Sequence, residues 1–330
     1  MHITVLGAGA WGTALATALA PRHAVQLWAR DGAALAAVAE KRRNERYLPG
    51  IELPAELHCT QDFAAAVAHA RHGLLLLATP TAALRDLVRQ LRSTASPPPL
   101  VWLCKGLERG SAAMAHEIVR EELGAHPAGP LSGPSFAQEV AQGLPTALTV
   151  AGVDAFCKLV TEALHSPPLR IYSTHDVIGV EVGGAVKNVL AIATGICDAL
   201  ALGHNARAAL ITRGLAEITR FGVALGAQAQ TFMGLTGVGD LILTCTGELS
   251  RNRQVGLMLG QGLPLADALA RLGHVAEGVW SAAAVRRRAS SLGVRMPITE
   301  AVCAVLEEKA SPRQALDLLL ARDPKREALE

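Results

Sequence analysis

The chain has 330 residues, which is enough for two domains of ordinary size, each with its own hydrophobic core. Half of the residues are hydrophobic and 18% are charged, so the composition excludes an intrinsically disordered protein. The 31 Lys and Arg residues nearly balance the 29 Asp and Glu residues, which leaves a formal net charge of +2. This balance argues against a protein that binds nucleic acid through a basic face.

The N-terminal residues run directly into a short apolar segment, Ile3 to Leu6, without the long apolar region of a signal peptide. A long uncharged stretch at residues 221–239 contains five glycines and makes a poor membrane span. The six cysteines are widely spaced, and none forms a CxxC pair. We therefore expect a cytoplasmic protein with free thiols, no disulfide framework and no metal site.

In the first half of the chain, short apolar runs alternate with segments of helical periodicity. Strands are predicted at residues 3–6, 24–28, 57–60, 73–79, 100–104, 130–132, 146–150 and 169–173. Helices are predicted at residues 12–20, 31–41, 62–69, 81–91 and 111–123. This alternation indicates a sheet of parallel strands with helices on its faces. The four consecutive leucines at 74–77 are typical of a strand that is buried on both faces.

From about Gly179 onward the pattern is helical throughout. Helices are predicted at residues 180–202, 206–225, 250–260, 264–272, 278–290, 298–306 and 312–321. We therefore predict an α/β fold with an N-terminal doubly wound (Rossmann-type), mostly parallel sheet domain at residues 1–178. A C-terminal all-helical domain, which we expect to bind the substrate, follows at residues 179–330.

A glycine-rich motif, Gly7-Ala8-Gly9-Ala10-Trp11-Gly12, follows the first predicted strand and opens the first predicted helix. In such a GxGxxG motif, Gly7 permits a tight turn, Gly9 lets the backbone approach a pyrophosphate, and Gly12 allows close packing of helix on strand. The N-terminus of the helix offers N–H groups and a positive dipole end to the phosphates. The motif in this context predicts a dinucleotide site; a glycine-rich turn without a ligand is the alternative.

The second predicted strand ends near Arg30, where an NAD site usually has Asp or Glu to bind the ribose 2′-hydroxyl. A guanidinium suits a 2′-phosphate by its charge and its fork of donors. We expect Asp31 to cap the next helix. The cofactor prediction is therefore NADPH, with NADH still possible; the alternative is an exposed arginine at a strand end.

Lys187 is the candidate catalytic residue. Of its neighbours three and four residues away on the predicted helix, Gly183, Gly184 and Ala191 are very small, so another helix or a ligand must fill the space beside it. From Val182 to Leu202 the only other charge is Asp198. An ammonium group in so apolar a helix is unusual, because a lone lysine is normally solvated.

Four further segments carry polar residues in apolar or glycine-rich settings. Lys105 follows a predicted strand at the edge of the sheet where ligands bind, and the turn at residues 132–137 can present backbone donors there. Asp240 follows a glycine-rich bend at residues 234–239, which brings backbone close to a ligand or to another backbone. The start of a helix at residues 250–253, with Ser250 as the expected N-cap, favours a phosphate site; an ordinary cap with surface arginines is the alternative.

Together these segments resemble the NAD(P)-dependent glycerol-3-phosphate dehydrogenase family of bacteria. The resemblance is carried by GAGAWGTALA from Gly7, RNERYLPGI from Arg43, CKGLE from Cys104, LSGPSFA from Leu131, EVGGAVKNVLAIATGICDAL from Glu181, and FMGLTGVGDLILTCT through LSRNR from Phe232. It spans most of the chain, with the segments in the order in which they occur in the family.

The resemblance implies reversible reduction of dihydroxyacetone phosphate to sn-glycerol 3-phosphate for phospholipid synthesis, with Lys187 as the proton donor and acceptor. The implied substrate-binding residues are Lys105, Gly133, Ser135, Lys187, Asp240, Ser250, Arg251 and Asn252. The cofactor-binding residues from the motif and the resemblance are Gly7, Gly9, Trp11, Gly12, Thr13, Arg30, Lys105, Ala137, Arg251, Val275 and Glu277. The helical half is similar to the second domain of related hydroxyacid-type dehydrogenases, which implies a homodimer.

Elementary chemistry agrees with these roles. A protonated Lys187 can stabilise a developing alkoxide and then give it a proton, and Asp240 could orient the lysine or the substrate hydroxyl. Two alternatives remain: a reductase of another keto acid or sugar phosphate, and a non-catalytic regulatory protein that senses dinucleotides. The phosphate-binding helix start argues against the first alternative, and Lys187 beside small residues argues against the second.

Overall fold

The computed structural model describes residues 1–94 and 96–321, and the chain divides into two compact units. The first unit comprises Met1–Cys104 and Ala115–Val177, and the second comprises Lys105–Met114 and Ile178–Glu330. Residues 105–114, which lie within the predicted N-terminal domain, group with the second unit, and Leu107, Ala112 and Met114 contribute to its hydrophobic core. That the two parts fold as separate domains stays a prediction.

The first unit is built on one eight-stranded sheet, in the order β3-β2-β1-β4-β5-β6-β7-β8. The strands are β1 (His2–Leu6), β2 (Ala24–Trp28), β3 (His58–Thr60), β4 (Leu74–Leu77), β5 (Leu100–Trp102), β6 (Ala128–Ser132), β7 (Thr146–Ala151) and β8 (Leu169–Thr174). Neighbouring strands are parallel except for β6 and β7, which are antiparallel. The strand order runs in both directions from β1, so the predicted doubly wound, mostly parallel sheet is confirmed.

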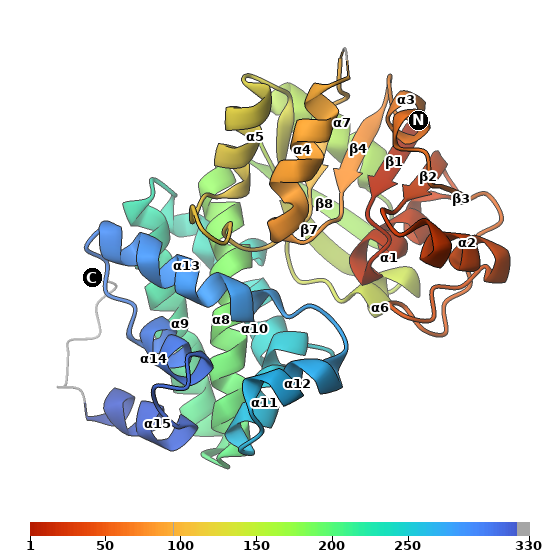
Figure 1. Cartoon of the computed structure of the whole chain (residues 1–330). Helices are drawn as coiled ribbons and strands as arrows, with labels where there is room; N and C mark the ends of the chain where they lie inside the picture. The colour runs from red at the N-terminus through yellow and green to blue at the C-terminus, as the bar shows by residue number, and fades with distance from the viewer. Residues whose placement is uncertain (95, 322–330) are drawn as a thin grey trace. The chain divides into compact units, whose positions relative to one another are not determined.

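Seven α-helices and one 3₁₀ turn are described in this unit. They are α1 (Ala10–Leu19), α2 (Gly32–Lys41), α3 (Phe63–His69), η1 (Thr81–Ala83), α4 (Leu84–Arg92), α5 (Ala115–Leu123), α6 (Ala137–Ala141) and α7 (Asp154–Leu164). Helices α4 and α5 pack side by side (Figure 1), and α1 packs against α6. Helices α6 and α7 were not predicted, although α7 buries Phe156, Val160 and Ala163 on one helical face.

Within the described part of the second unit, the regular elements are all helical, as predicted. They are α8 (Val177–Ala199), α9 (Gly203–Ala224), η2 (Ala229–Met233), η3 (Leu235–Gly239), α10 (Asp240–Thr246), α11 (Arg251–Gly260), α12 (Leu265–Leu272), α13 (Glu277–Ser291), α14 (Pro297–Leu306) and α15 (Pro312–Leu320). Helix α8 passes through the middle of the unit, with the other helices around it (Figure 1).

Helix α8 is the core of the second unit. By length and composition it is the one helix in the described part of the chain that could cross a membrane, but 89% of its most apolar window is buried inside the structure. Its glycines allow close approach by neighbours, since a Cβ on Gly183 would lie 2.1 Å from the Thr236 carbonyl oxygen. Helix α8 is therefore a core helix, against whose backbone its neighbours pack closely.

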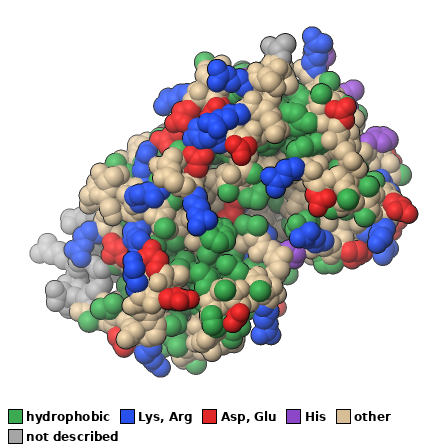
Figure 2. All heavy atoms as spheres, viewed as in Figure 1, with side chains coloured by type: hydrophobic (Ala, Val, Ile, Leu, Met, Phe, Trp, Pro, Cys, Tyr) green, Lys and Arg blue, Asp and Glu red, His purple; other side chains and the backbone are tan. Residues whose placement is uncertain are grey.

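The surface carries charges of both signs. On the face seen in Figure 2, lysine and arginine side chains are interspersed with aspartate and glutamate side chains rather than gathered into one basic patch. This mixture matches the near balance of charges in the sequence.

Candidate active site

The glycine-rich loop of the first unit joins β1 to α1. Gly7 has a φ of +128°, and a Cβ there would lie 2.5 Å from the carbonyl oxygen of Ala78. A Cβ on Gly12 would lie 2.0 Å from the carbonyl oxygen of Gly7, whereas a Cβ on Gly9 would meet no atom within 4 Å. Gly7 and Gly12 are therefore needed for close backbone contacts within the protein, whereas Gly9 leaves open space at the start of α1.

The surroundings of this loop fit a dinucleotide. Helix α1 begins after Gly9 without a side-chain cap, so its first N–H groups are available to an anion. Four buried polar atoms without a hydrogen-bond partner among the described residues also lie in the loop or where strands end: Trp11 Nε1, Thr79 Oγ1, Trp102 Nε1 and Ser132 Oγ. Buried polar atoms are rarely left unpaired, and the carboxyl ends of parallel strands are the usual ligand site in this fold.

Thr13 and Asn44 shape the loop from behind. The Asn44 side-chain amide donates to the Ala8 carbonyl oxygen at 2.9 Å and to Thr13 Oγ1 at 2.8 Å. Thr13 is fully buried, and its N–H donates to the carbonyl oxygen of Gly9. Thr13 thus uses its polar groups inside the unit, and cofactor binding by Thr13 stays a prediction. Asn44 was missed as a site residue, although it belongs to the segment from Arg43 that carries the family resemblance.

Arg30 lies just after β2 and is exposed. The adjacent Asp31 is the N-cap of α2, with its carboxylate accepting from the N–H of Ala34 at 3.1 Å, as predicted. The cap uses one oxygen of the Asp31 carboxylate, the Arg30 guanidinium is exposed beside it, and selection of the cofactor by Arg30 stays a prediction.

The turn after β6 carries three predicted residues. Gly133 has a φ of +138°, and the Ser135 hydroxyl donates to the Gly133 carbonyl oxygen at 3.1 Å. Ala137 is the first residue of α6. This tight turn leaves the N–H groups at the start of α6 without a side-chain cap, which suits a polar ligand.

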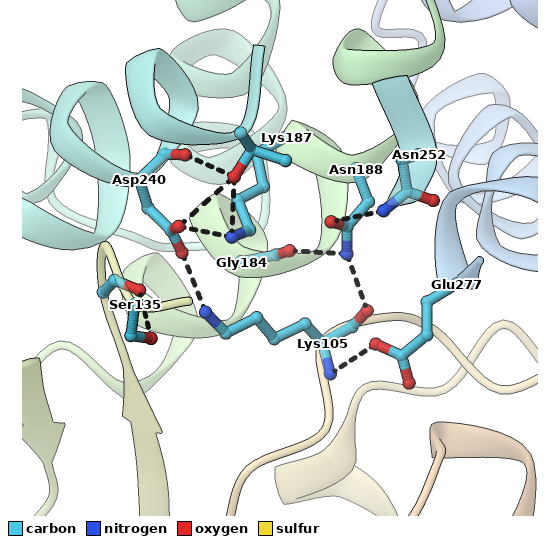
Figure 3. A network of polar contacts seen from close by, with 10 residues as sticks. Lys105, Ser135, Gly184, Lys187, Asn188, Asp240, Asn252 and Glu277 are labelled. Carbon is cyan, nitrogen blue, oxygen red and sulfur yellow. Dashed lines mark hydrogen bonds and ion pairs between the residues drawn. The ribbon is translucent and has the colours of Figure 1, made fainter. Parts of the chain in front are cut away.

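In the helical unit, Lys187, Asp240 and Lys105 form a buried charge cluster (Figure 3). The Lys187 ammonium group donates to Asp240 Oδ1 and, at 3.0 Å, to Thr244 Oγ1. The Lys105 ammonium group donates to the other oxygen of the same carboxylate at 2.9 Å. Lys187 is 6% exposed and Asp240 is fully buried. The contact fits one of the two roles predicted for Asp240, orientation of Lys187 rather than of the substrate hydroxyl, and that role stays a prediction. The contact of Lys187 with Thr244 was missed.

Burial and charge set the protonation of this cluster. Burial lowers the pKa of Lys187 to about 7, against the opposing attraction of Asp240 and with a smaller contribution from the positive charge of Lys105. Burial alone would raise the pKa of Asp240, but Lys105 and Lys187 outweigh it and hold that pKa below its usual value. Asp240 therefore stays ionised, while Lys187 can gain or lose a proton near neutral pH.

A second set of hydrogen bonds fixes the main chain at Lys105. Its N–H donates to Glu277 Oε2 at 3.1 Å, and its carbonyl oxygen accepts from the Asn188 amide at 3.3 Å (Figure 3). Asn188 Oδ1 accepts from Asn252 at 2.9 Å, and Asn252 Oδ1 accepts from the N–H of Gly278 at 3.0 Å. Asn188 was missed by the sequence analysis, and it links α8 to the Lys105 segment, α11 and α13.

Of the two alternatives for the glycine-rich segment before Asp240, contact with a ligand or with another backbone, the structure shows the backbone contact. Residues Leu235–Gly239 form one turn of π-helix that leads directly into α10. A Cβ on Gly237 would lie 2.0 Å from the carbonyl oxygen of Phe232, and Gly183 of α8 faces the Thr236 carbonyl. The glycines bring backbone against backbone, so the small residue at Gly183 is explained by helix packing, which in turn places Asp240 beside Lys187.

The start of α11 carries the predicted phosphate residues. Ser250 is the N-cap, its hydroxyl accepting from the N–H of Arg253 at 3.3 Å, as predicted. Arg251 is exposed at the first helical position, whereas Asn252 is buried and its amide is engaged with Asn188 and Gly278. Val275 lies 43% exposed shortly before α13. Arg251 is thus exposed at the start of the helix while Asn252 is engaged inside the unit, and phosphate binding by either residue stays a prediction.

A glycine-rich loop at the switch point of a parallel sheet and a buried lysine with a shifted pKa define a dinucleotide-dependent oxidoreductase. Among the described residues, no group of three or more His, Cys, Asp or Glu side chains could hold a metal ion. All six cysteines are free.

Comparison with known proteins identifies the family. Residues 2–157 match the N-terminal domain, and residues 176–317 the C-terminal domain, of NAD-dependent glycerol-3-phosphate dehydrogenase. Glycerol-3-phosphate dehydrogenase (NAD(P)+) of Paucimonas lemoignei is 61% identical over 100% of this chain and 99% of its own, and the Herminiimonas arsenicoxydans protein is 61% identical over 99% of each chain. The crystal structure of glycerol-3-phosphate dehydrogenase from Coxiella burnetii superposes with a TM-score of 0.93, at 41% identity over 97% of this chain and 98% of that one. The chain belongs to the NAD-dependent glycerol-3-phosphate dehydrogenase family and is an NAD(P)-dependent oxidoreductase.

Proposed function

We propose that this chain catalyses the reversible reduction of dihydroxyacetone phosphate to sn-glycerol 3-phosphate, with Lys187 as the proton donor and acceptor. Membership of the family supports dihydroxyacetone phosphate as the substrate. The buried contact of Lys187 with Asp240 is the observation that supports its role in proton transfer. Because burial lowers its pKa to about 7, Lys187 can donate a proton in one direction and accept one in the other near neutral pH.

NAD(P)H, when bound, would supply the hydride that reduces the carbonyl carbon of the substrate. As negative charge develops on the carbonyl oxygen, the Lys187 ammonium group stabilises it and then donates a proton to give the hydroxyl. In the reverse direction, the neutral Lys187 amine accepts the hydroxyl proton. Asp240 orients Lys187 through its carboxylate, and Lys105 adds a second positive charge beside the developing alkoxide.

The phosphate of the substrate serves as its positioning handle at the start of α11. Arg251 and the N–H groups of the first turn hold it, and Ser250 shapes that turn as the N-cap. Gly133 and Ser135 offer a turn that also suits the substrate. Arg251→Ala should weaken the binding of dihydroxyacetone phosphate and leave the low activity on non-phosphorylated dihydroxyacetone nearly unchanged. Equal losses with both substrates would contradict this role.

For the cofactor, Gly9 and the start of α1 would hold the pyrophosphate, and Arg30 favours NADPH over NADH by reaching a 2′-phosphate. The predicted contributions of Trp11, Ala137, Val275 and Glu277 to cofactor binding are supported by the family resemblance. The Glu277 carboxylate already accepts from the Lys105 N–H, which would couple its position to that of the lysine.

The product is the phosphorylated backbone of glycerophospholipids, and we propose that the enzyme supplies their synthesis in the cytoplasm as a homodimer. The family resemblance supports this assignment, and light scattering of the purified protein tests the dimer.

The reaction itself is tested by following the loss of reduced-cofactor absorbance after addition of dihydroxyacetone phosphate. Turnover with this substrate, and much slower turnover with keto acids or other sugar phosphates, is the expected result. Faster turnover with one of those compounds would favour a different reductase. Cofactor binding without turnover on any of them would favour the dinucleotide sensor.

A further inference from the structure

Asp198 is the only charged residue besides Lys187 between positions 182 and 202, and the chemistry proposed above does not use it. It lies near the end of α8, where its Oδ2 atom accepts from Nε and Nη2 of Arg253 at 2.9 and 2.7 Å. Its carboxylate also accepts from Nη1 of Arg207 at 3.2 and 3.3 Å. The Asp198 and Arg253 side chains are only 16% and 14% exposed, so each charge depends on its partner.

Arg253 is held at both ends. Its N–H donates to the Ser250 hydroxyl within the first turn of α11, while its guanidinium is directed to Asp198 on α8. Arg251, two residues earlier, is exposed. The two arginines at the start of this helix therefore differ: Arg251 is exposed and can contact a ligand, whereas Arg253 connects the first turn of α11 to α8 through an ion pair.

Helices α8 and α11 also meet without intervening side chains. A Cβ on Gly195 would lie 2.1 Å from the carbonyl oxygen of Arg253, and a Cβ on Gly256 would lie 2.1 Å from that of Ile192. Asn252, next to Arg253, donates to Asn188 Oδ1 at 2.9 Å. The first turn of α11 is thus fixed to α8 by two polar contacts and by a backbone contact at Gly195.

We propose that Asp198 and Arg253 are positioning residues that set the place of the substrate phosphate relative to Lys187. The ion pair orients the first turn of α11 so that its N–H groups and Arg251 meet the phosphate, while the same helix α8 carries the proton donor. The proposal rests on the proposed function, since it assigns a phosphate to this helix start. A displaced first turn binds the phosphate more weakly, because its N–H groups and Arg251 no longer converge on the same anion.

The test is Asp198→Asn, assayed with dihydroxyacetone phosphate and with non-phosphorylated dihydroxyacetone. We expect KM for the phosphorylated substrate to rise by about tenfold, with a smaller change in kcat. The kcat/KM for dihydroxyacetone should stay within about twofold of wild type, because that substrate does not use the helix start. Proportional losses with both substrates would show a general structural role and overturn the proposal.

Arg207→Gln is the matched control, because Arg207 contacts the same carboxylate from α9 and not from α11. Its KM for dihydroxyacetone phosphate should stay close to that of wild type; an increase as large as that of Asp198→Asn would overturn the proposal. If Asp198→Asn does not fold, Arg253→Lys keeps the charge but loses the guanidinium fork. It should raise KM for the phosphorylated substrate selectively, and an unchanged KM would contradict the proposal.

Titration calorimetry with inorganic phosphate separates this proposal from the proposed function, because it requires no turnover. Phosphate should bind more weakly to Asp198→Asn than to wild type and to Arg207→Gln. Equal binding to all three proteins would overturn the positioning role. A wild-type protein that binds phosphate but does not reduce dihydroxyacetone phosphate would instead contradict the proposed function alone.

Discussion

The ammonium group of Lys187 lies on one oxygen of the Asp240 carboxylate, and both groups are buried in the helical unit. Lys105 occupies the other oxygen of that carboxylate at 2.9 Å. Two positive charges thus share one negative charge, and burial lowers the pKa of Lys187 to about 7.

The two directions of the reaction should respond oppositely to pH. Reduction needs the protonated Lys187, so its kcat/KM should fall by about tenfold per pH unit above a pKa of about 7. Oxidation needs the neutral amine, so its kcat/KM should rise with pH until it levels off above that pKa. Initial rates across the pH range, measured in both directions, test this. A reduction rate that increases through neutrality would contradict the assignment.

Asp240→Asn should move this pH profile. The carboxylate of Asp240 raises the pKa of Lys187, so its loss should shift the profile for reduction to lower pH and reduce the rate at neutral pH. Thr244→Val is the control, since it removes a neutral hydrogen-bond partner of Lys187 and should shift the profile less. The account fails on this point if Thr244→Val shifts the profile as far as Asp240→Asn does.

Substitutions at two glycines of one loop should separate cofactor binding from folding. A Cβ at Gly9 meets no protein atom within 4 Å, so Gly9→Ala should leave the melting temperature near wild type but weaken NADPH binding, because the methyl group occupies pyrophosphate space. Gly12→Ala should lower the melting temperature by several degrees, because its Cβ would lie 2.0 Å from the carbonyl oxygen of Gly7. Unimpaired NADPH binding by Gly9→Ala would argue against a dinucleotide at this loop.

Arg30→Ala tests the cofactor preference. Loss of a charge-assisted contact with the 2′-phosphate should weaken NADPH binding by about tenfold or more and leave NADH binding unchanged. Arg71→Ala, an exposed arginine elsewhere in the first unit, should change neither affinity. An unaltered ratio of NADPH to NADH affinity in Arg30→Ala would remove this residue from cofactor selection.

Because Glu217 is buried, we expect the free energy of unfolding to depend on pH, separately from any effect of pH on catalysis. It is 3% exposed and accepts hydrogen bonds from the N–H groups of Ile298 and Thr299 at the start of α14. Burial raises its pKa to about 7, against the opposing effects of these bonds and of Arg220. The folded state therefore binds this proton more tightly than the unfolded state, so its contribution to stability is greatest below the ordinary glutamate pKa and declines as the pH rises to about 7.

Urea unfolding of wild type and Glu217→Gln, from about pH 5 to pH 8, measures this contribution. The free energy of unfolding of wild type relative to the variant should decrease up to about pH 7 and remain constant from there to pH 8. A difference that does not vary with pH would contradict the shifted pKa.

Local rules predicted much of the fold and part of the site. The glycine spacing, the Asp31 and Ser250 caps and the alternation of strands and helices depend on neighbouring residues, and the structure confirms each of them. Residues 105–114 group with the helical unit through long-range apolar packing, which no local pattern in the sequence reveals. The close backbone contacts of the glycines before Asp240 were one predicted alternative, but the π-helical turn that they form was not predicted.

The site residues that the sequence did not predict also depend on contacts between distant parts of the chain. The partners of Asn44 and Asn188 lie far away in the sequence, so no spacing rule connects them. Thr244 was accessible in principle, because it follows Asp240 by four residues and such pairs share one face of a helix. Predicting its contact with the site required recognising residues 240–246 as a helix.

The most direct test of the account is the turnover of Lys187→Ala with dihydroxyacetone phosphate and NADPH, measured beside its affinity for NADPH. Removal of the proton donor should reduce kcat by about 10²- to 10⁴-fold and leave NADPH binding close to wild type. Turnover near the wild-type rate would contradict the central claim that this buried lysine transfers the proton.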